Sequence, residues 1–494
     1  MRISLTVFSA IYSLSYLLTR DHFNQTSLYK FLQNILKIKS SRLAFYAATL
    51  FLSVIFPAVW IRHQALETRA FDLGIFSQAV WNTTQGNFLY SSLKEGICLL
   101  GDHVSPVLAF IVPIYKFLPD PRILLVLQMF ATAFNVLLIR RICKFKGLSA
   151  IATLFFLLAY IFYVPVRGPL YEDFHPEILV EPFMLGAFLF LEKKNYGKFL
   201  FCSLIVLLGK ESMAGIVFML GFYGLITKKN APVSLLTMFT AVLVFVFDVK
   251  WVVPFFSHKS YLYKGFYLYL AQGHWSELIK IIASLDSLEY LTRVFSPLVF
   301  LSFFHLPAFS LTLPILAQNI LSVNPVMRSF GYHYTIGLTP FVFVSSIYGY
   351  CFILKKIKFF SNHEVKIASL LLVLSILQSG PSSYFYYWNS SKKITPHTEL
   401  IRRKLDKIDA QYSVLTHNNL VPQLANRKYV YQFEYNEAPT KWESAEKLRA
   451  DYVVFDQIFW EPGTAPIEET KNEMAKAGYL VDFSQGTFFI FRKR

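Results

Sequence analysis

The sequence predicts an α-helical polytopic membrane protein with a small α/β domain at its C-terminal end. Three observations lead to this prediction. Hydrophobic residues make up 54% of the 494 residues and charged residues only 16%, which is less charge than a soluble enzyme of this length carries. Several apolar runs, such as 232–256, approach or exceed the roughly 20 residues that cross a bilayer. The hydrophobic runs then stop after residue 380.

The basic residues indicate how the chain crosses the membrane. The net charge is +17, and most Lys and Arg residues lie in short clusters between apolar runs. Such clusters mark the cytoplasmic ends of spans, so we do not expect a nucleic-acid partner. The cluster within 30–42 places the start of the first clear span, 43–61, in the cytoplasm. The cluster within 140–146 marks the next cytoplasmic return, so the loop 62–122 is expected outside.

This rule predicts about eleven transmembrane helices within 43–380, with the N-terminus inside and the C-terminus outside the cytoplasmic (inner) membrane. Residues 1–42 are expected to be an interfacial or cytoplasmic segment, and whether 3–19 also spans is left open. The stretch 105–118 is apolar but short and contains two prolines, so we place it on the outer surface. The expected spans are 43–61, 123–140, 149–166, 178–192, a hairpin in 197–227, 232–256, a second hairpin of 291–306 and 308–322 around Pro307, 334–354 and 365–379.

Residues 381–494 are predicted to form a soluble extracytoplasmic α/β domain. Three stretches have strand composition: "YSVLTH", "KYVYQF" and "DYVVFDQ". The stretch "IEETKNEMAKAGY" has helical spacing, and the last residues predict a hairpin about Gln485 and Gly486. The four cysteines lie in unrelated segments without metal-type spacing, so neither a disulfide framework nor a cysteine zinc site is expected.

Polar residues gather near the outer ends of the expected spans. Ionisable side chains at membrane depth are costly, which favours a functional role for them. By the predicted topology all of them fall on one side, so we expect them to form one site. They are Asp72, Gln78, Asn82, Asp102 and His103 in the first loop, Glu172, Asp173, His175 and Glu177 in "YEDFHPE", Lys210 and Glu211 in a hairpin turn, and Arg328, Tyr332, His333 and Tyr334 in "RSFGYHY".

Each group also has a purely structural explanation. Asp72 can cap the helix that it begins, and "YEDFHPE" can be a solvated turn before a helix that starts with proline. Lys210 and Glu211 can simply pair with each other. A divalent metal ion is an open alternative, because carboxylates and imidazoles are common ligands of such ions. Its expected ligands would be Asp102, His103, Asp173 and His175.

These residue types suit one kind of chemistry. A carboxylate in an apolar groove can act as a general base near neutral pH. Cationic and hydrogen-bonding groups opposite it can stabilise a phosphate leaving group, and the apolar groove can hold a lipid tail. The combination suits sugar transfer from a lipid-phosphate carrier to an acceptor hydroxyl.

The sequence from residue 71 onward also resembles a known family. The stretches that carry the resemblance are "FDLGIFSQAVWNTTQGNFLYSS", "LLGDHVSPVLAFIVPIYKFLP", "DFHPEILVEPF", "LLGKESMAG", "GYHYTIGLTPF" and "ADYVVFDQ". They resemble a family of polytopic bacterial and archaeal membrane proteins that is known as a domain of unknown function. That family is grouped with the GT-C superfamily of polyprenyl-phosphate-dependent glycosyltransferases. The resemblance covers most of 43–460 and implies a GT-C-like membrane domain over 43–380.

The resemblance implies roles for individual residues. GT-C proteins keep a carboxylate just after the first span, where Asp72 stands, and this would be the catalytic base. A second carboxylate near the third span corresponds to Asp173, and a lysine at the tip of a later hairpin corresponds to Lys210. The usual His/Pro-containing segment corresponds to "GDHVSP", where Ser105-Pro106 matches the double proline only in part.

The first hypothesis is therefore an inverting glycosyltransferase at the outer face of the cytoplasmic membrane. Asp72 would accept the acceptor proton, and Lys210, with His333 or Arg328, would bind the phosphate. Asp173, Asp102 and His103 would orient the acceptor or a divalent ion. Further substrate contacts are expected from Glu211, Tyr332, His175 and Gln78. The acceptor, a glycan, a lipid or a protein, is left open.

Two other hypotheses remain. A flippase or transporter for a lipid-linked or anionic substrate could use the same polar cavity. Broken spans and charges at the membrane midplane would favour it, whereas the charges here gather at one face, which favours the enzyme. The third hypothesis is an assembly protein whose outer domain binds a partner.

Overall fold

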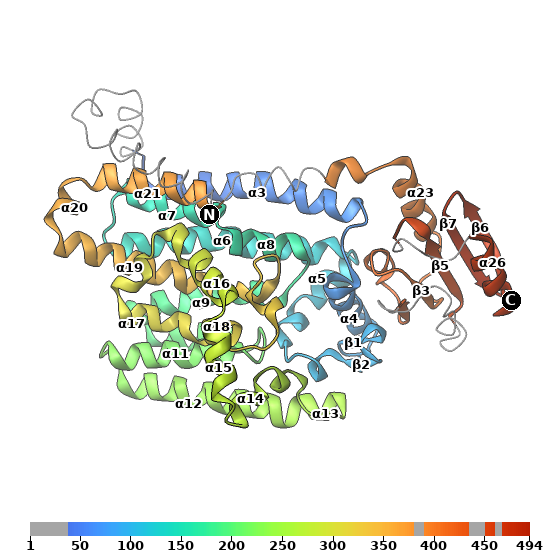
Figure 1. The fold of residues 1–494 in the computed structure, drawn as a ribbon, viewed down its shortest axis with the longest axis horizontal. Coiled ribbons are helices and arrows are strands. Elements are labelled where there is room, and N and C mark those ends of the chain that lie inside the picture. The colour runs from blue at the N-terminus through green and yellow to red at the C-terminus, as the bar shows by residue number, and fades with distance from the viewer. Residues whose placement is uncertain (1–37, 380–389, 434–449, 460–466) are drawn as a thin grey trace.

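The computed structural model describes residues 38–379, 390–433, 450–459 and 467–494, and it is mostly helical (Figure 1). A long bundle of helices makes up most of the molecule, and a small mixed sheet lies at one end of it. The expectation for residues 1–42 falls almost wholly outside the described residues.

Within the described residues, four helical stretches are long and apolar enough to cross a membrane. They are α3 (Ser40–Gln64), α6 (Arg122–Phe145), the stretch that joins α7 (Ala150–Phe162) and α8 (Val164–Glu172), and the stretch from α12 (Ala231–Phe247) to α13 (Val253–Ser257). Other apolar helices of the bundle are α9 (Pro176–Glu192), α10 (Tyr196–Leu207), α11 (Met213–Ile226), α19 (Thr339–Lys356) and α21 (Glu364–Ser379). The predicted membrane class agrees with this composition, while the count of eleven spans stays a prediction.

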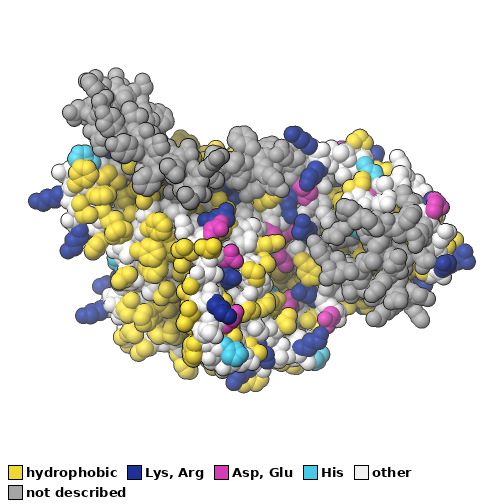
Figure 2. All heavy atoms as spheres, in the orientation of Figure 1, with side chains coloured by type: hydrophobic (Ala, Val, Ile, Leu, Met, Phe, Trp, Pro, Cys, Tyr) yellow, Lys and Arg dark blue, Asp and Glu magenta, His cyan; other side chains and the backbone are white. Residues whose placement is uncertain are grey.

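The outside of the bundle is apolar, as a lipid-facing surface must be. Along α12, side chains such as Leu236, Phe239 and Leu243 are more than half exposed. A helix that is hydrophobic on every side and yet exposed is expected in a bilayer rather than in water. Figure 2 shows hydrophobic side chains spread over the bundle, with Lys and Arg side chains at its left edge and charged side chains of both signs in the middle of the view.

Two local predictions hold and two fail. The hairpin expected in 197–227 is present as α10 and α11, with Lys210 in the turn between them, and 105–118 forms only short helices. The continuous span expected over 291–306 is wrong. Helix α16 (Leu285–Phe295) ends there, and 3-10 turns follow that contain Pro297, which cannot continue the hydrogen-bonding of a helix.

The hairpin that we expected around Pro307 is also absent. Helix α17 (Leu306–Phe309) continues through a 3-10 turn into α18 (Leu313–Ile320), so the two form one run of helix. A proline in the first turn of a helix is tolerated because its missing N–H has no partner there in any case. Pro307 therefore begins this helix and does not turn the chain.

The C-terminal unit, residues 390–494, contains the predicted strands. Its sheet has the order β4-β3-β5-β7-β6, in which β4, β3 and β5 are parallel and β7 is antiparallel to both neighbours. The three strand stretches and the hairpin are confirmed, with Gly486 at positive φ in the turn. The elements are α23 (Pro396–Leu405), β3 (Val414–Thr416), α24 (Val421–Leu424), β4 (Val430–Gln432), β5 (Tyr452–Asp456), α26 (Ile467–Lys476), β6 (Tyr479–Gln485) and β7 (Phe488–Lys493).

The C-terminal unit is fastened to the loop that follows α3. Leu66 and Ala70 are fully buried in the core of the unit, among residues of its sheet and helices. The backbone N–H of Ala70 donates to the side chain of Asn418 at 2.8 Å, and the amide of Asn419 donates to the carbonyl of Leu66 at 3.0 Å. The residues just before Asp72 therefore belong to the helical bundle in sequence and pack in the core of the C-terminal unit.

Candidate functional site

A cavity of about 1040 Å³ lies where the bundle meets the C-terminal unit. Phe218 of α11, with Val242 and Phe245 of α12, lines one part of it with apolar side chains. Ionisable side chains line another part, and Asn418 of the C-terminal unit contributes to the wall. Concave sites that combine an apolar wall with a few convergent polar groups are typical of ligand binding.

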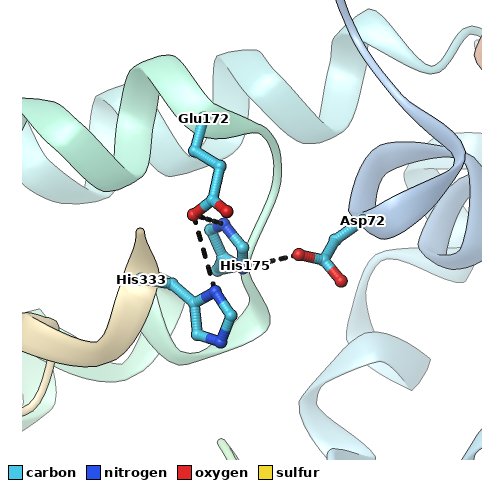
Figure 3. Close-up of side chains that lie close together, drawn as sticks. All are labelled: Asp72, Glu172, His175 and His333. Carbon is cyan, nitrogen blue, oxygen red and sulfur yellow. Dashed lines mark ion pairs between the residues drawn. The ribbon is translucent and has the colours of Figure 1, made fainter. Parts of the chain in front are cut away.

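Four side chains from distant parts of the sequence converge in this cavity: Asp72, Glu172, His175 and His333 (Figure 3). One ligand-type atom from each lies within 4.8 Å of those of the others. Glu172 Oε2 is 3.2 Å from His175 Nε2 and 3.5 Å from His333 Nδ1. Asp72 Oδ2 is 3.7 Å from the other ring nitrogen of His175, Nδ1.

Two local features explain this convergence. Gln128 of α6 clamps the link between α8 and α9, because its amide donates to the carbonyl of Asp173 and accepts from the N–H of His175. Gly168 of α8 lets the loop that carries His333 approach closely. A Cβ atom at Gly168 would lie only 2.1 Å from the carbonyl oxygen of Phe330, so no larger residue fits against this loop.

The two imidazoles differ in charge. Their rings stack with centroids 4.2 Å apart. Burial lowers the pKa of His175, but the close contact with the Glu172 carboxylate and the charge of Asp72 outweigh it and raise the pKa to about 8. Burial lowers the pKa of His333, and the positive charge of His175 lowers it further. His175 therefore carries the proton and His333 stays neutral near pH 7.

Three buried atoms of this cluster lack a hydrogen bond of normal geometry: Glu172 Oε2, His175 Nε2 and His333 Nδ1. Buried polar atoms without a partner are uncommon and need an explanation. Two imidazole nitrogens and a carboxylate oxygen are a common ligand set for a catalytic zinc ion that keeps an open position. A single ring cannot offer both nitrogens to one ion, so Asp72 would orient His175 from its other side.

Asp173 is held in place on both of its oxygens. It is 1% exposed, its Oδ1 lies 2.9 Å from Arg62 Nη1, and its Oδ2 accepts from the backbone N–H of Arg69 at 3.0 Å. Burial raises its pKa to about 7 against the opposing charge of Arg62. These contacts fix the loop before Asp72, and the catalytic role expected for Asp173 stays a prediction.

Asp102 and His103 lie in the same cavity but away from His175. His103 Nδ1 is 2.9 Å from Glu211 Oε1, and Glu211 also accepts from the hydroxyl of Tyr261 and the N–H of Val104. Asp102 pairs with Lys94 at 2.7 Å. The structure therefore does not bring together the metal-ligand set Asp102, His103, Asp173 and His175.

Lys210 has a partner other than its neighbour in sequence. Its Nζ lies 2.8 Å from Glu177 Oε1, and burial of its ammonium is outweighed by Glu177 and Glu211, so its pKa is raised. The positive charge of Lys210 outweighs the effect of burial on Glu177 and lowers the pKa of its carboxyl group. The pair lines the cavity together with Glu211, Tyr332 and His333.

Two predicted site residues lie elsewhere. Gln78 is fully buried, and its amide donates to the carbonyls of Arg427 and Lys428, so it joins the bundle to the C-terminal unit. Arg328 donates to the carbonyls of Asn319, Ile320 and Ser322 at the end of α18. Neither residue is among those that line the cavity.

Among the lining residues, Glu172 was expected at the site but was given no individual role, and Arg69 and Lys264 were not predicted. Glu172 stands next to Asp173 in "YEDFHPE", and its spacing from His175 was the available signal. Arg69 and Lys264 make no ion pair among the described residues, and both are exposed. Their loops have no periodic pattern from which sequence could place them.

Comparison with known proteins agrees with this architecture. A family model described as "Predicted membrane protein (DUF2079)" matches residues 62–481. The chain belongs to this family. No match was found among curated proteins.

Solved structures place this DUF2079 chain in a fold class. It is similar to the crystal structure of ArnT from Cupriavidus metallidurans bound to undecaprenyl phosphate, with 10% identity, a TM-score of 0.53, and coverage of 90% of this chain and 97% of that one. The apo state of ArnT gives a TM-score of 0.48 at the same identity and coverage. The first comparison shows that the DUF2079 chain shares the fold of ArnT, a GT-C glycosyltransferase, as the resemblance implied.

Proposed function

We propose that this chain is a membrane glycosyltransferase that moves a sugar from a polyprenyl-phosphate carrier to an acceptor hydroxyl. The observation that carries the proposal is the cavity that joins an apolar wall to Asp72, Lys210 and the two imidazoles. An apolar wall suits a polyprenyl chain, and the ionisable end suits a sugar phosphate. The ArnT structure with the shared fold was solved with undecaprenyl phosphate, which supports this class of carrier.

Asp72 is the candidate general base. Its side chain is 25% exposed and lines the cavity, and its Oδ2 is 3.7 Å from His175 Nδ1. In an inverting transfer, the acceptor oxygen forms the bond to the anomeric carbon of the sugar while its proton passes to Asp72. The bond from that carbon to the phosphate oxygen breaks, and its electron pair leaves on the carrier phosphate.

Positive charge near the phosphate would stabilise this leaving group. Lys210 is held in place by Glu177, and Lys264 adds a charge without an ion-pair partner among the described residues. We infer that Glu172, His333 and His175, once His175 has released its second proton, would also hold a divalent cation here, with Asp72 orienting His175. When bound, such an ion would supply a further positive charge to the phosphate oxygens.

The test is transfer by Asp72→Asn. Full-length protein is reconstituted with radiolabelled undecaprenyl-phosphate sugars and membranes that contain the native acceptors. Asparagine keeps the shape and most hydrogen bonds of aspartate but takes no proton, so we expect transfer to fall by roughly 10²–10⁴-fold with the protein still folded. A transporter would leave the label on the carrier.

The matched control is Asp286→Asn, which changes an exposed carboxylate on α16 that is not a cavity-lining residue. It should transfer sugar as the unaltered chain does. Near-normal transfer by Asp72→Asn would show that Asp72 has only a structural role, since asparagine caps a helix about as well as aspartate.

A further inference from the structure

A second cavity, of about 1080 Å³, lies beside the first. Its walls include the end of α3 and the loop after it, α8, the loop 329–332 and the C-terminal unit, which contributes Lys392, Lys393 and Thr395 among others. Four residues line both cavities: Arg62, Arg69, Glu172 and Tyr332. The two cavities therefore meet beside Glu172, one of the four residues of the cluster with Asp72.

The second cavity is basic. Its described lining residues include five Arg or Lys residues against two glutamates: Arg62, Arg69, Arg293, Lys392 and Lys393 against Glu67 and Glu172. Arg62 is bound by Asp173, and Lys393 by Glu67. The side chains of Arg69 and Lys392 are exposed and form no ion pair among the described residues. Two cations are therefore available to a ligand.

The backbone orients one of these cations. The N–H of Arg69 donates to Asp173, and the N–H of Ala70 donates to Asn418 of the C-terminal unit. These two bonds fix the backbone from which the Arg69 side chain extends. A guanidinium presents paired donors that match the oxygens of a carboxylate or a phosphate. Lys392 approaches from the other body, so the pair can clamp an anion between the bundle and the C-terminal unit.

We propose that the second cavity is the acceptor site and that the acceptor is anionic, carrying a phosphate or carboxylate that Arg69 and Lys392 bind. The acceptor hydroxyl then extends past Glu172 into the first cavity and reaches Asp72. The use of this cavity as the acceptor site rests on the proposed function. The anion site itself follows from the charge and position of the second cavity.

The experiment measures binding, so it does not depend on transfer. The full chain is purified in detergent, and native mass spectrometry gives the affinity for glycerol 3-phosphate, for phosphatidylglycerol and, separately, for undecaprenyl phosphate. The variant Arg69→Gln/Lys392→Gln is compared with the control Lys259→Gln/Lys280→Gln. The control removes two exposed lysines that are outside both sets of lining residues.

We expect the first variant to lose at least about tenfold in affinity for the anionic probe, because each charge-assisted hydrogen bond contributes roughly a factor of ten. The control variant should bind as the unaltered chain does. Binding of glycerol 3-phosphate would support a soluble anionic acceptor, and binding of phosphatidylglycerol alone would support a lipid. Equal binding by both variants, or no binding of either probe, would overturn the assignment.

The same measurement separates the two proposals. Lys392→Gln alone should lower the affinity for the anionic probe and leave the affinity for undecaprenyl phosphate unchanged, because Lys392 lines only the second cavity. If undecaprenyl phosphate does not bind while the anionic probe still depends on Arg69, the proposed function fails and the anion site stands.

Discussion

Replacing Gly168 by alanine should disable the site through a single backbone contact. The added Cβ would lie 2.1 Å from the carbonyl oxygen of Phe330, whereas carbon and oxygen in such contacts normally keep about 3.3–3.6 Å. The loop must therefore retreat by roughly 1 Å. His333 follows Phe330 by three residues, and its Nδ1 already lies 3.5 Å from Glu172 Oε2, so this movement separates the pair.

The expected cost has two parts. Overpacking a close contact destabilises a protein by roughly 1–3 kcal/mol, and a misplacement of about 1 Å at a catalytic site can lower the rate about 10²-fold. Both are measurable on the purified protein, the first by its melting temperature and the second by transfer of labelled sugar. The larger loss should be in transfer.

Two control glycines isolate the effect. A Cβ at Gly349 would lie 1.9 Å from the carbonyl oxygen of Leu301, which is also an overpacked contact, but neither residue lines the cavity. Gly349→Ala should lower stability with a smaller loss of transfer. A Cβ at Gly197 meets nothing within 4 Å, so Gly197→Ala should be neutral or slightly stabilising. Normal transfer and normal melting of Gly168→Ala would refute the reasoning.

Three further outcomes are expected. Glu172→Gln removes one candidate ligand atom, so divalent metal measured by inductively coupled plasma mass spectrometry should fall from stoichiometric to substoichiometric, while the exposed control Glu277→Gln retains it. Burial lowers the pKa of His417 to about 3, below its value near 6.5 in the unfolded chain. Between these two pH values the unfolded chain binds more protons than the folded one, so the folded protein loses on the order of 2 kcal/mol of stability from pH 7 to pH 5. His417→Gln should reduce this dependence of the melting temperature on pH. Deleting residues 390–494 should give aggregated protein on size-exclusion chromatography, because the deletion exposes the apolar side chains of Leu66 and Ala70. Monodisperse protein with normal carrier binding would contradict this prediction.

Much of the fold could be predicted because its signals are local. Apolar length identified the helices, basic clusters identified the hairpin of α10 and α11, and strand composition identified β3, β4 and β5. The break after α16 was missed because composition does not reveal where a helix stops in an apolar run. Proline has opposite effects at two neighbouring positions here: Pro297 lies where a helix has ended, and Pro307 lies where one begins.

The site could be predicted in its members but not in their pairing. Asp72, His175 and His333 converge as expected, yet Lys210 pairs with Glu177 and Asp173 with Arg62. Such pairings depend on how helices pack across the bundle, and nothing in the sequence around either partner specifies them. The same limit explains Gln78, whose polar side chain near a membrane span suggested a ligand but joins two parts of the protein.

The position of Asp72 depends on both bodies of the protein. Asp173 in the bundle holds the backbone N–H of Arg69, and Asn418 in the C-terminal unit holds that of Ala70, so two successive residues before the base are fixed from different sides. A rotation of the C-terminal unit would carry Asn418 away and release the loop. Because residues of the same unit also line the second cavity, an acceptor bound there would contact the body that positions the base. The C-terminal unit is therefore part of the candidate site in physical terms, although its own sequence contains no catalytic pattern.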